Sequence, residues 1–406
     1  MKETMTTHLT KRVSLGAVAV ASALLFSACA SPSSDNSSEP SESGSSSTAS
    51  DTRVALTYDG GLYVLDGDSL EVLSDLPLDG FNRLNPAGDG RNVMVSVSDG
   101  FRVLDTAAGT DEDAVLTDLL FDAPTPGHVV RHAGKTILFS DGTGDTIIYE
   151  TAALDASGEL PETEVIPSEA AHHGVAIELE DGTLLSTLGN ADGRSGIRVL
   201  DQDRTEIARS EDCPSVHGEG TAQNEVTVFG CSNGVLIYDA GEITKLTAPD
   251  AYGRTGNQYV SETSPLTVGD YNSDPDSEGS LLSQLVITDT AAKTLTVIDM
   301  PEGAEYTWRG VARTADNNAL VLASDGALHT LNVETGEFTA STPVIDAWEG
   351  PAEWQDAHPA LIVIGDTAYI TDPATNSIHT ADATTGEILA TGTLDETPNE
   401  IAVVTQ

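Results

Sequence analysis

Three short stretches decide the fold: Pro126-Gly-His-Val-Val130, Ala171-His-His-Gly-Val175 and Ser215-Val-His-Gly-Glu219. Each carries a histidine, and His128, His173 and His217 are separated by 45 and 44 residues. A repeat of about 40–45 residues, with four short strands per unit, is typical of a β-propeller. In a propeller the first strand of every blade lines a central channel. The spacing therefore predicts that the three histidines occupy one position of three successive channel-lining strands and converge.

The remainder of the chain has the same period. From Thr52 onward, strand-like segments alternate with Asp-Gly, Asn-Gly and Thr-Gly turns, and no long stretch has helical apolar periodicity. A strand that ends in an apolar pair and a polar residue recurs eight times, from Val64-Leu65-Asp66 to, more loosely, Thr380-Ala381-Asp382. The 355 residues of region 52–406 give about 44 per unit, the usual blade size. We predict an all-β protein, a β-propeller of eight four-stranded blades.

The ends of this region predict how the ring closes. Residues 53–76 contain three strands with no channel-lining strand before them, and Asn399–Val404 form one strand. Together they complete one four-stranded blade that pairs the N- and C-terminal strands and leaves no open edge. Seven blades is the alternative, because the fifth unit, about Asn257–Met300, is long and irregular.

Residues 1–28 predict a lipoprotein signal peptide that lies outside the fold. Lys11-Arg12 precede an apolar core of 14 residues, Val13–Phe26, which is too short for a comfortable membrane span. Ser27-Ala28-Cys29 resembles a bacterial lipobox, in which Cys29 is lipidated, although phenylalanine stands where leucine is usual. An ordinary secretory signal is the alternative. Both predict export, and the first predicts a lipid anchor on the outer face of the cell membrane.

Residues 29–51 predict a flexible tether, because serine dominates them and almost nothing apolar is available for burial. The whole chain has a formal net charge of −47, which repels nucleic acid and anionic lipid. The same charge attracts cations such as Zn²⁺ towards the channel mouth, although solubility alone accounts for most of it.

Two cysteines remain after Cys29, and both lie in the fourth unit. Export implies an oxidising compartment, so a disulfide between Cys213 and Cys231 is the default prediction. Such a bond also holds the segment that carries His217. The alternative is that Cys213 and His217 are joint zinc ligands.

Three converging imidazoles suit Zn²⁺, and three protein ligands leave a fourth position for water or a carboxylate. Candidate carboxylates are Asp79, at the start of the first complete unit, and Glu219, two residues beyond His217 on the same face of a strand.

The remaining histidines have weaker expectations. His132 lies four residues beyond His128 on one strand, about 13 Å away, so it cannot share a metal with it. We expect a satisfied polar residue there, with a second metal site as the alternative. His172 and His173 point to opposite faces of a strand, which leaves His172 behind the metal or at the rim. Structural or surface roles are expected for His329, His358 and His379.

These residues resemble a known family, the AztD-type zinc metallochaperones. The resemblance is carried by His128–His132, by His172–Val175, by Cys213–Glu219 with Gly230-Cys231, and by the later segments Asp366–Pro373 and Thr397–Glu400. Some members have a metal-catching segment rich in histidine and aspartate near the N-terminus. Here that region is serine-rich without histidine, so a second, mobile zinc site is not predicted.

The resemblance implies an exported propeller that stores zinc and delivers it directly to the solute-binding protein of a zinc ABC importer. We also expect a monomer that is not an enzyme. Two alternatives remain, a metal-free interaction scaffold and a zinc-dependent hydrolase. Against a hydrolase, the sequence contains no His-Glu-x-x-His, Gly-x-Ser-x-Gly or P-loop motif, although Glu219 could serve as a catalytic base.

Overall fold

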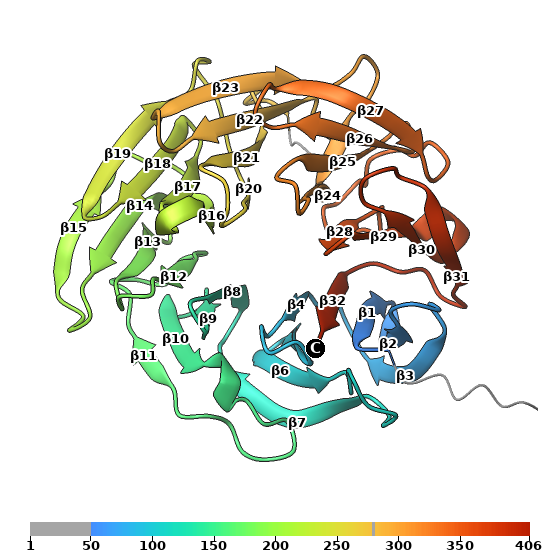
Figure 1. The fold of residues 1–406 in the computed structure, drawn as a ribbon. Coiled ribbons are helices and arrows are strands. Elements are labelled where there is room, and N and C mark those ends of the chain that lie inside the picture. The colour runs from blue at the N-terminus through green and yellow to red at the C-terminus, as the bar shows by residue number, and fades with distance from the viewer. Residues whose placement is uncertain (1–49, 278–280) are drawn as a thin grey trace, which may run out of the picture. The chain divides into compact units, whose positions relative to one another are not determined.

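The computed structural model describes residues 50–277 and 281–406. The predicted signal peptide, Cys29 and the tether lie outside these residues. The described residues contain eight four-stranded antiparallel sheets, so the prediction of eight blades is confirmed and the seven-bladed alternative is wrong. The sheets follow one another around a ring, with one edge strand of each blade nearest the centre (Figure 1). Within the described part of the chain, no helix has the length and apolar character needed to cross a membrane.

The first four complete blades are numbered from the sheet that follows Asp79. Blade 1 contains β4 (Leu84–Pro86), β5 (Asn92–Val97), β6 (Gly100–Asp105) and β7 (Val115–Asp122). Blade 2 contains β8 (Pro126–His132), β9 (Lys135–Ser140), β10 (Asp145–Glu150) and β11 (Glu164–Ile166). Blade 3 contains β12 (Ala176–Glu178), β13 (Leu184–Asn190), β14 (Gly193–Leu200) and β15 (Glu206–Ser210). Blade 4 contains β16 (His217–Thr221), β17 (Thr227–Cys231), β18 (Gly234–Asp239) and β19 (Glu242–Thr247).

The next three blades continue the ring. Blade 5 contains β20 (Gln258–Tyr259), β21 (Leu266–Tyr271), β22 (Gln284–Asp289) and β23 (Thr294–Asp299). Blade 6 contains β24 (Tyr306–Arg313), β25 (Ala319–Ala323), β26 (Ala327–Asn332) and β27 (Glu337–Pro343). Blade 7 contains β28 (Leu361–Ile364), β29 (Thr367–Asp372), β30 (Ser377–Asp382) and β31 (Ile388–Thr393). In the part of the chain that the structure describes, three short 3₁₀ helices interrupt the connections: η1 (Thr151–Ala153), η2 (Gln223–Glu225) and η3 (Pro373–Thr375).

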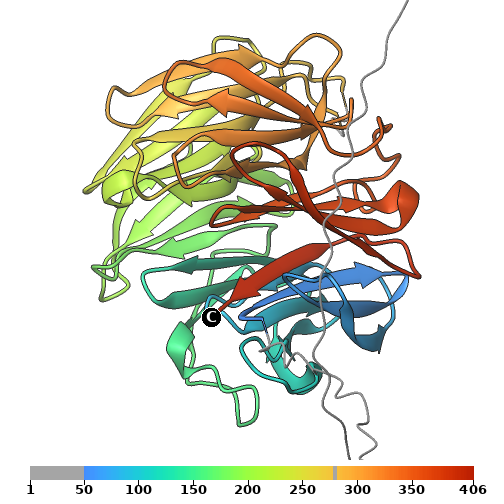
Figure 2. The ribbon, with the colours of Figure 1, turned by 45° about the vertical axis from the view of Figure 1, so that its right-hand side comes forward.

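The eighth blade closes the ring as predicted. It contains β3 (Val72–Leu78), β2 (Gly60–Asp66), β1 (Thr52–Tyr58) and the C-terminal strand β32 (Ile401–Thr405), in that order. β32 pairs antiparallel with β1, and in the turned view it lies along the N-terminal blade (Figure 2). The backbone N–H of Glu400 also donates to the Thr57 hydroxyl, 343 residues away in sequence. The closure removes the open edge that β1 would otherwise present.

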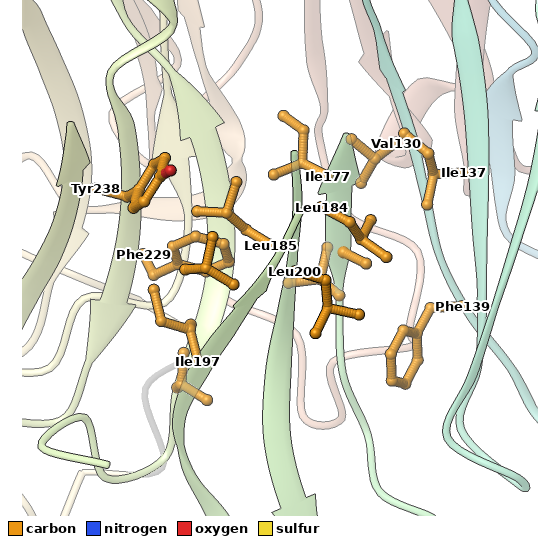
Figure 3. Packing of buried hydrophobic residues seen from close by; sticks show 14 of the residues in the cluster. Val130, Ile137, Phe139, Ile177, Leu184, Leu185, Ile197, Leu200, Phe229 and Tyr238 are labelled. Carbon is orange, nitrogen blue, oxygen red and sulfur yellow. The ribbon is translucent and has the colours of Figure 1, made fainter. Parts of the chain in front are cut away.

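The core lies between the blades. The second strand of each blade is buried along most of its length; β17, for example, is buried at every position. One cluster joins blades 2, 3 and 4 (Figure 3), with Val130 and Ile137 from the first, Leu185 from the second and Phe229 and Tyr238 from the third. Burial of each such side chain contributes about 1.5–3 kcal/mol. This packing fixes the three blades that carry the recurring histidines against one another.

Candidate metal centre

The three recurring histidines come from three adjacent blades, but not from equivalent strand positions. His128 lies within β8, and His217 is the first residue of β16. His173 lies in the connection before β12, which begins only at Ala176. The expectation that His172 and His173 alternate on a strand is therefore wrong. A short β12 leaves the His173 segment free to curve towards the channel.

The structure brings the three imidazoles together. Each pair of ring centroids, among His128, His173 and His217, is 5.1 Å apart. One ligand nitrogen from each ring lies within 4.8 Å of the others. Among the described residues, no other group of three histidine, cysteine or carboxylate side chains is arranged in this way. Three imidazole nitrogens that face one point are a ligand set that Zn²⁺ prefers.

Two of the three rings are oriented through their Nδ1 atoms. The Nδ1–H of His173 donates to Oδ2 of Asp141 at 2.6 Å, and that of His217 donates to the Gly256 carbonyl at 2.5 Å. A ring that donates from Nδ1 keeps the lone pair of Nε2 for a metal ion. Hydrogen bonds of this kind fix both the tautomer and the direction of metal-binding histidines.

A second layer of contacts holds the Gly256 carbonyl in place. Asp270 is buried, and its Oδ1 accepts hydrogen bonds from the backbone N–H groups of Gly256 and Asn257. Its Oδ2 accepts a third from the Asn257 amide at 2.8 Å. Asp270 thus anchors the loop whose carbonyl orients His217, although it contacts no histidine itself.

The glycines that follow His173 and His217 allow the rings to approach. Gly218 has φ +58°, and a Cβ there would lie 2.3 Å from the Gly256 oxygen. A Cβ on Gly174 would lie 2.3 Å from Thr187 Oγ1 and 2.6 Å from the Phe139 ring. Only glycine fits both positions without displacing backbone or packed side chains. The recurring His-Gly pair therefore has a steric cause.

Burial keeps His128 and His217 unprotonated. The pKa of His128 is lowered well below its ordinary value by burial, and next by the neighbouring His217 and His173. Burial lowers the pKa of His217 to about 3, against an opposing effect of the Gly256 carbonyl. Metal binding requires neutral imidazoles, and both rings meet this condition at neutral pH.

The two candidate carboxylates lie outside the histidine group. Asp79 is exposed in the connection between β3 and β4. Glu219 was expected on the same face as His217, but the pairing of β16 with β17 shifts register by a bulge at Gly218, which breaks the simple alternation. Burial raises the pKa of Glu219 to about 7, with Arg131 opposing the shift.

The two second-tier histidines have protein partners. His132 Nε2 lies 2.7 Å from Glu225 Oε1, in agreement with the expected satisfied polar role. His172 is buried, with Nδ1 donating to the Ala170 carbonyl at 2.9 Å and Nε2 accepting from the Thr187 hydroxyl at 3.1 Å. Its ring packs edge-on against Phe139, behind the segment that carries His173.

The expected disulfide is present. Cys213 and Cys231 are bonded and fully buried, 18 residues apart in sequence. Cys213 precedes β16 and Cys231 ends β17, so the bond ties the segment that leads into His217 to the end of the second strand of the hairpin. Because both sulfurs are in the disulfide, the alternative of Cys213 as a zinc ligand does not apply to this state.

The histidines open into a cavity of about 620 Å³ in the centre of the ring. Three arginines line it with them, Arg83, Arg194 and Arg254, together with Trp308 and Trp354. The net charge led us to expect an acidic channel mouth that attracts cations, but arginines lie beside the histidines instead.

Sequence reasoning missed Asp141, Asp270 and these arginines. Asp141 precedes a glycine after β9 and resembles the other Asp-Gly turns of the chain, so nothing in the sequence distinguishes it. Arg194 and Arg254 come from different blades, and only the closed ring places them together.

Comparisons with known proteins agree with this architecture. No protein-family model matches the chain. The zinc chaperone AztD of Citrobacter koseri is 24% identical over 349 residues, which cover 79% of this chain and 77% of that protein. A structure of apo AztD from Citrobacter koseri superimposes with a TM-score of 0.72 at 21% identity, covering 87% of this chain and 97% of that chain. A crystal structure of the same protein gives a TM-score of 0.73 at 20% identity, with the same coverage. The predicted fold and the predicted resemblance to AztD are both confirmed.

Proposed function

We propose that this protein is an extracytoplasmic zinc chaperone that binds one Zn²⁺ through His128, His173 and His217 and transfers it to a partner protein. The observation that carries the proposal is the triangle of imidazoles, with ring centroids 5.1 Å apart in every pair. The similarity to a protein named as a zinc chaperone supports the same role.

The partner we propose is the solute-binding protein of a zinc ABC importer. Three protein ligands leave a fourth coordination position open. An incoming histidine or carboxylate of the acceptor can enter that position before the three imidazoles release the ion. A closed four-ligand site offers no such entry. Exchange through a shared intermediate is therefore compatible with a three-histidine site.

We further propose that residues 1–28 direct export, that Cys29 is lipidated, and that residues 29–51 tether the propeller, residues 52–406, as a monomer to the outer face of the membrane. The buried disulfide supports an oxidising compartment. The role contains no catalytic step, so we propose no enzymatic activity.

The first experiment is an equilibrium zinc titration of the metal-stripped protein against a competing chelator. We expect one tight site per chain. If no such site is found, the alternative function, a metal-free interaction scaffold, would be the one that remains. A hydrolase screen of the zinc-loaded protein then tests the enzyme alternative, with Glu219→Gln as the variant that removes its base.

The second experiment measures transfer. The zinc-loaded protein is mixed with the apo solute-binding protein, and the transfer rate is compared with spontaneous release into excess chelator. We expect transfer to be the faster process. A transfer rate that never exceeds release would mean that the protein buffers zinc passively.

A further inference from the structure

The cavity beside the histidines concentrates positive charge in a chain that has little of it. The whole protein has 18 lysines and arginines against 65 acidic residues. Three arginines nevertheless line this single cavity: Arg83 precedes β4, Arg194 lies in β14, and Arg254 lies between β19 and β20. Such convergence of like charges is unfavourable unless an anion compensates it.

Two of these guanidinium groups form no ion pair within the described residues, although Asp141 lies near Arg194 and Asp270 near Arg254. Within the described residues, the Arg194 side chain makes no hydrogen bond and no ion pair, and the charged groups that influence its pKa are Arg254 and Asp141. Arg254 donates only a long bond, 3.4 Å, to the Ser215 carbonyl. Arginines elsewhere in the protein are commonly paired, as Arg204 is with Glu164 and Glu178.

Arg83 is the third arginine of the cavity wall. Its guanidinium lies 4.9 Å from the Trp308 ring centroid and 6.0 Å from that of Trp354. Its Nε is buried without a hydrogen-bond partner and lies 3.6 Å from Oε2 of Glu400. Glu400 is already paired with the buried Arg309, so it does not neutralise both cations.

The cavity wall itself supplies little negative charge. Among the described lining residues Asp270 is the one carboxylate, and both of its oxygens accept hydrogen bonds from Gly256 and Asn257. Asp141 is a second carboxylate near Arg194, and its Oδ2 accepts a hydrogen bond from His173. A bound Zn²⁺ would add two positive charges to this wall, so zinc loading increases the demand for an anion.

We propose that the cavity is a carboxylate-binding site, in which Arg194 and Arg254 hold a carboxylate against the open face of the three histidines. The guanidinium fork matches a carboxylate in two-point geometry, and carboxylate oxygen is an ordinary zinc ligand. The bound group would bridge the cationic wall and the fourth coordination position. The zinc-linked part of this inference rests on the proposed function.

Two sources of the carboxylate share this chemistry. One is an acidic side chain of the zinc-accepting protein, and the other is a small free carboxylate. The cavity volume of about 620 Å³ admits either.

Binding is tested with acetate and succinate as probes, at constant ionic strength balanced with chloride. Trp308 and Trp354, two of the three tryptophans, line the cavity, so their fluorescence is the reporter. We expect a saturable change that is tighter in the zinc-loaded than in the metal-free protein. The double variant Arg194→Gln/Arg254→Gln should weaken it about ten-fold or more, the loss expected for a charge-assisted pair.

The matched control is Arg102→Gln, which removes an arginine paired with the exposed Asp118 on blade 1. It should bind both probes like the wild type. A change that does not saturate, or that is equal in the double variant and the wild type, would overturn the proposal. A response to inorganic phosphate without one to the carboxylates would show that the ligand class is wrong.

Cobalt(II) in place of zinc provides an independent readout, because its visible absorption changes when a carboxylate enters the coordination sphere. If zinc or cobalt binds tightly and no probe alters the spectrum, this inference fails while the proposed function stands. If no metal binds, the proposed function fails, and the fluorescence titration of the metal-free protein still tests the arginine site.

A competition experiment distinguishes the two sources of the carboxylate. Succinate that slows zinc transfer to the apo acceptor shows that an acceptor carboxylate uses the same site. Transfer that is unchanged at saturating succinate assigns the site to a free carboxylate.

Discussion

The Nδ1–H of His173 donates a 2.6 Å hydrogen bond to Oδ2 of Asp141, a residue of the neighbouring blade. The other oxygen of Asp141 accepts the backbone N–H of Gly174 at 3.3 Å. One carboxylate from blade 2 therefore holds both the ring of His173 and the start of the segment that follows it. His173 is the most exposed of the three histidines, so this bond is its main restraint.

Asp141→Asn should lower zinc affinity about 10–100-fold, the usual cost of losing a carboxylate that orients a metal-binding histidine. The amide is isosteric and can still accept from Gly174, so the thermal midpoint should change little. Chelator competition measures the affinity. Asp118→Asn, at an exposed carboxylate on β7, is the control and should bind zinc like the wild type. Unchanged affinity in Asp141→Asn would mean that His173 is not held by this bond when zinc is present.

His128→Ala, His173→Ala and His217→Ala should each weaken zinc binding by at least about ten-fold, because each removes one of three ligands. Backbone pairing should survive truncation of one side chain. His379→Ala is the control, since His379 lies on β30 and bonds to Ser377 and Thr391. Wild-type affinity in any of the three variants would remove that histidine from the ligand set.

Loss of the disulfide should reduce stability and zinc affinity together. In the chain-entropy model, a bond that closes a loop of 18 residues contributes about 3 kcal/mol. Cys213→Ser with Cys231→Ser should lower the thermal midpoint and loosen the strand that begins with His217. Two reactive thiols in the folded, unreduced wild type would contradict the premise.

Gly218→Ala should damage the metal site more than the fold. The substitution places a Cβ 2.3 Å from the Gly256 oxygen that orients His217. Gly365→Ala is the matched control, because Gly365 has φ +57° but open space around its Cβ position. Both variants should lose about 1–2 kcal/mol of stability from the left-handed backbone. Only Gly218→Ala should lose zinc affinity, and equal affinities in the two variants would refute the steric argument.

Acid should destabilise the metal-free protein through His358. Burial, and then Arg309, lowers the pKa of His358 from 6.5 to about 4. Its Nδ1–H donates to the Asp356 carbonyl, and its buried Nε2 has no partner for a second proton. The unfolded chain takes up this proton as the pH falls below about 6.5, whereas the folded chain does so only near 4.

As the pH falls from 6.5 to 4, the free energy of unfolding should therefore decrease by about 3 kcal/mol because of this residue. Urea unfolding at several pH values measures the slope, and His358→Gln should flatten it relative to the wild type. Identical slopes in the wild type and the variant would show that His358 takes up its proton in the folded protein as readily as in the unfolded chain.

The repeat could be predicted because each blade uses local signals. Turn residues and short β-rich segments occur at a fixed period, and the unpaired strands at the two ends of the repeat predicted the β1–β32 pairing. Blade 5 was harder to predict, since its inner strand β20 has only two residues.

The site could be predicted only in part. The spacing of His128, His173 and His217 predicted their convergence, and the structure brings them together. That His173 lies in a connection, and that Gly218 forms a bulge, depends on contacts with other blades. Asp141 and the cavity arginines have no local signature, because their roles arise from neighbours that are distant in sequence.

Because β1 pairs with β32, the closing blade cannot be completed until the last strand of the chain has been made. During synthesis and export, β1 emerges more than 300 residues before its partner, and its hydrogen-bonding edge stays uncovered for that whole interval. The three histidines, His128, His173 and His217, emerge within the first half of that interval. An uncovered edge invites pairing with other chains, so the growing chain is most vulnerable to aggregation until its final strand arrives.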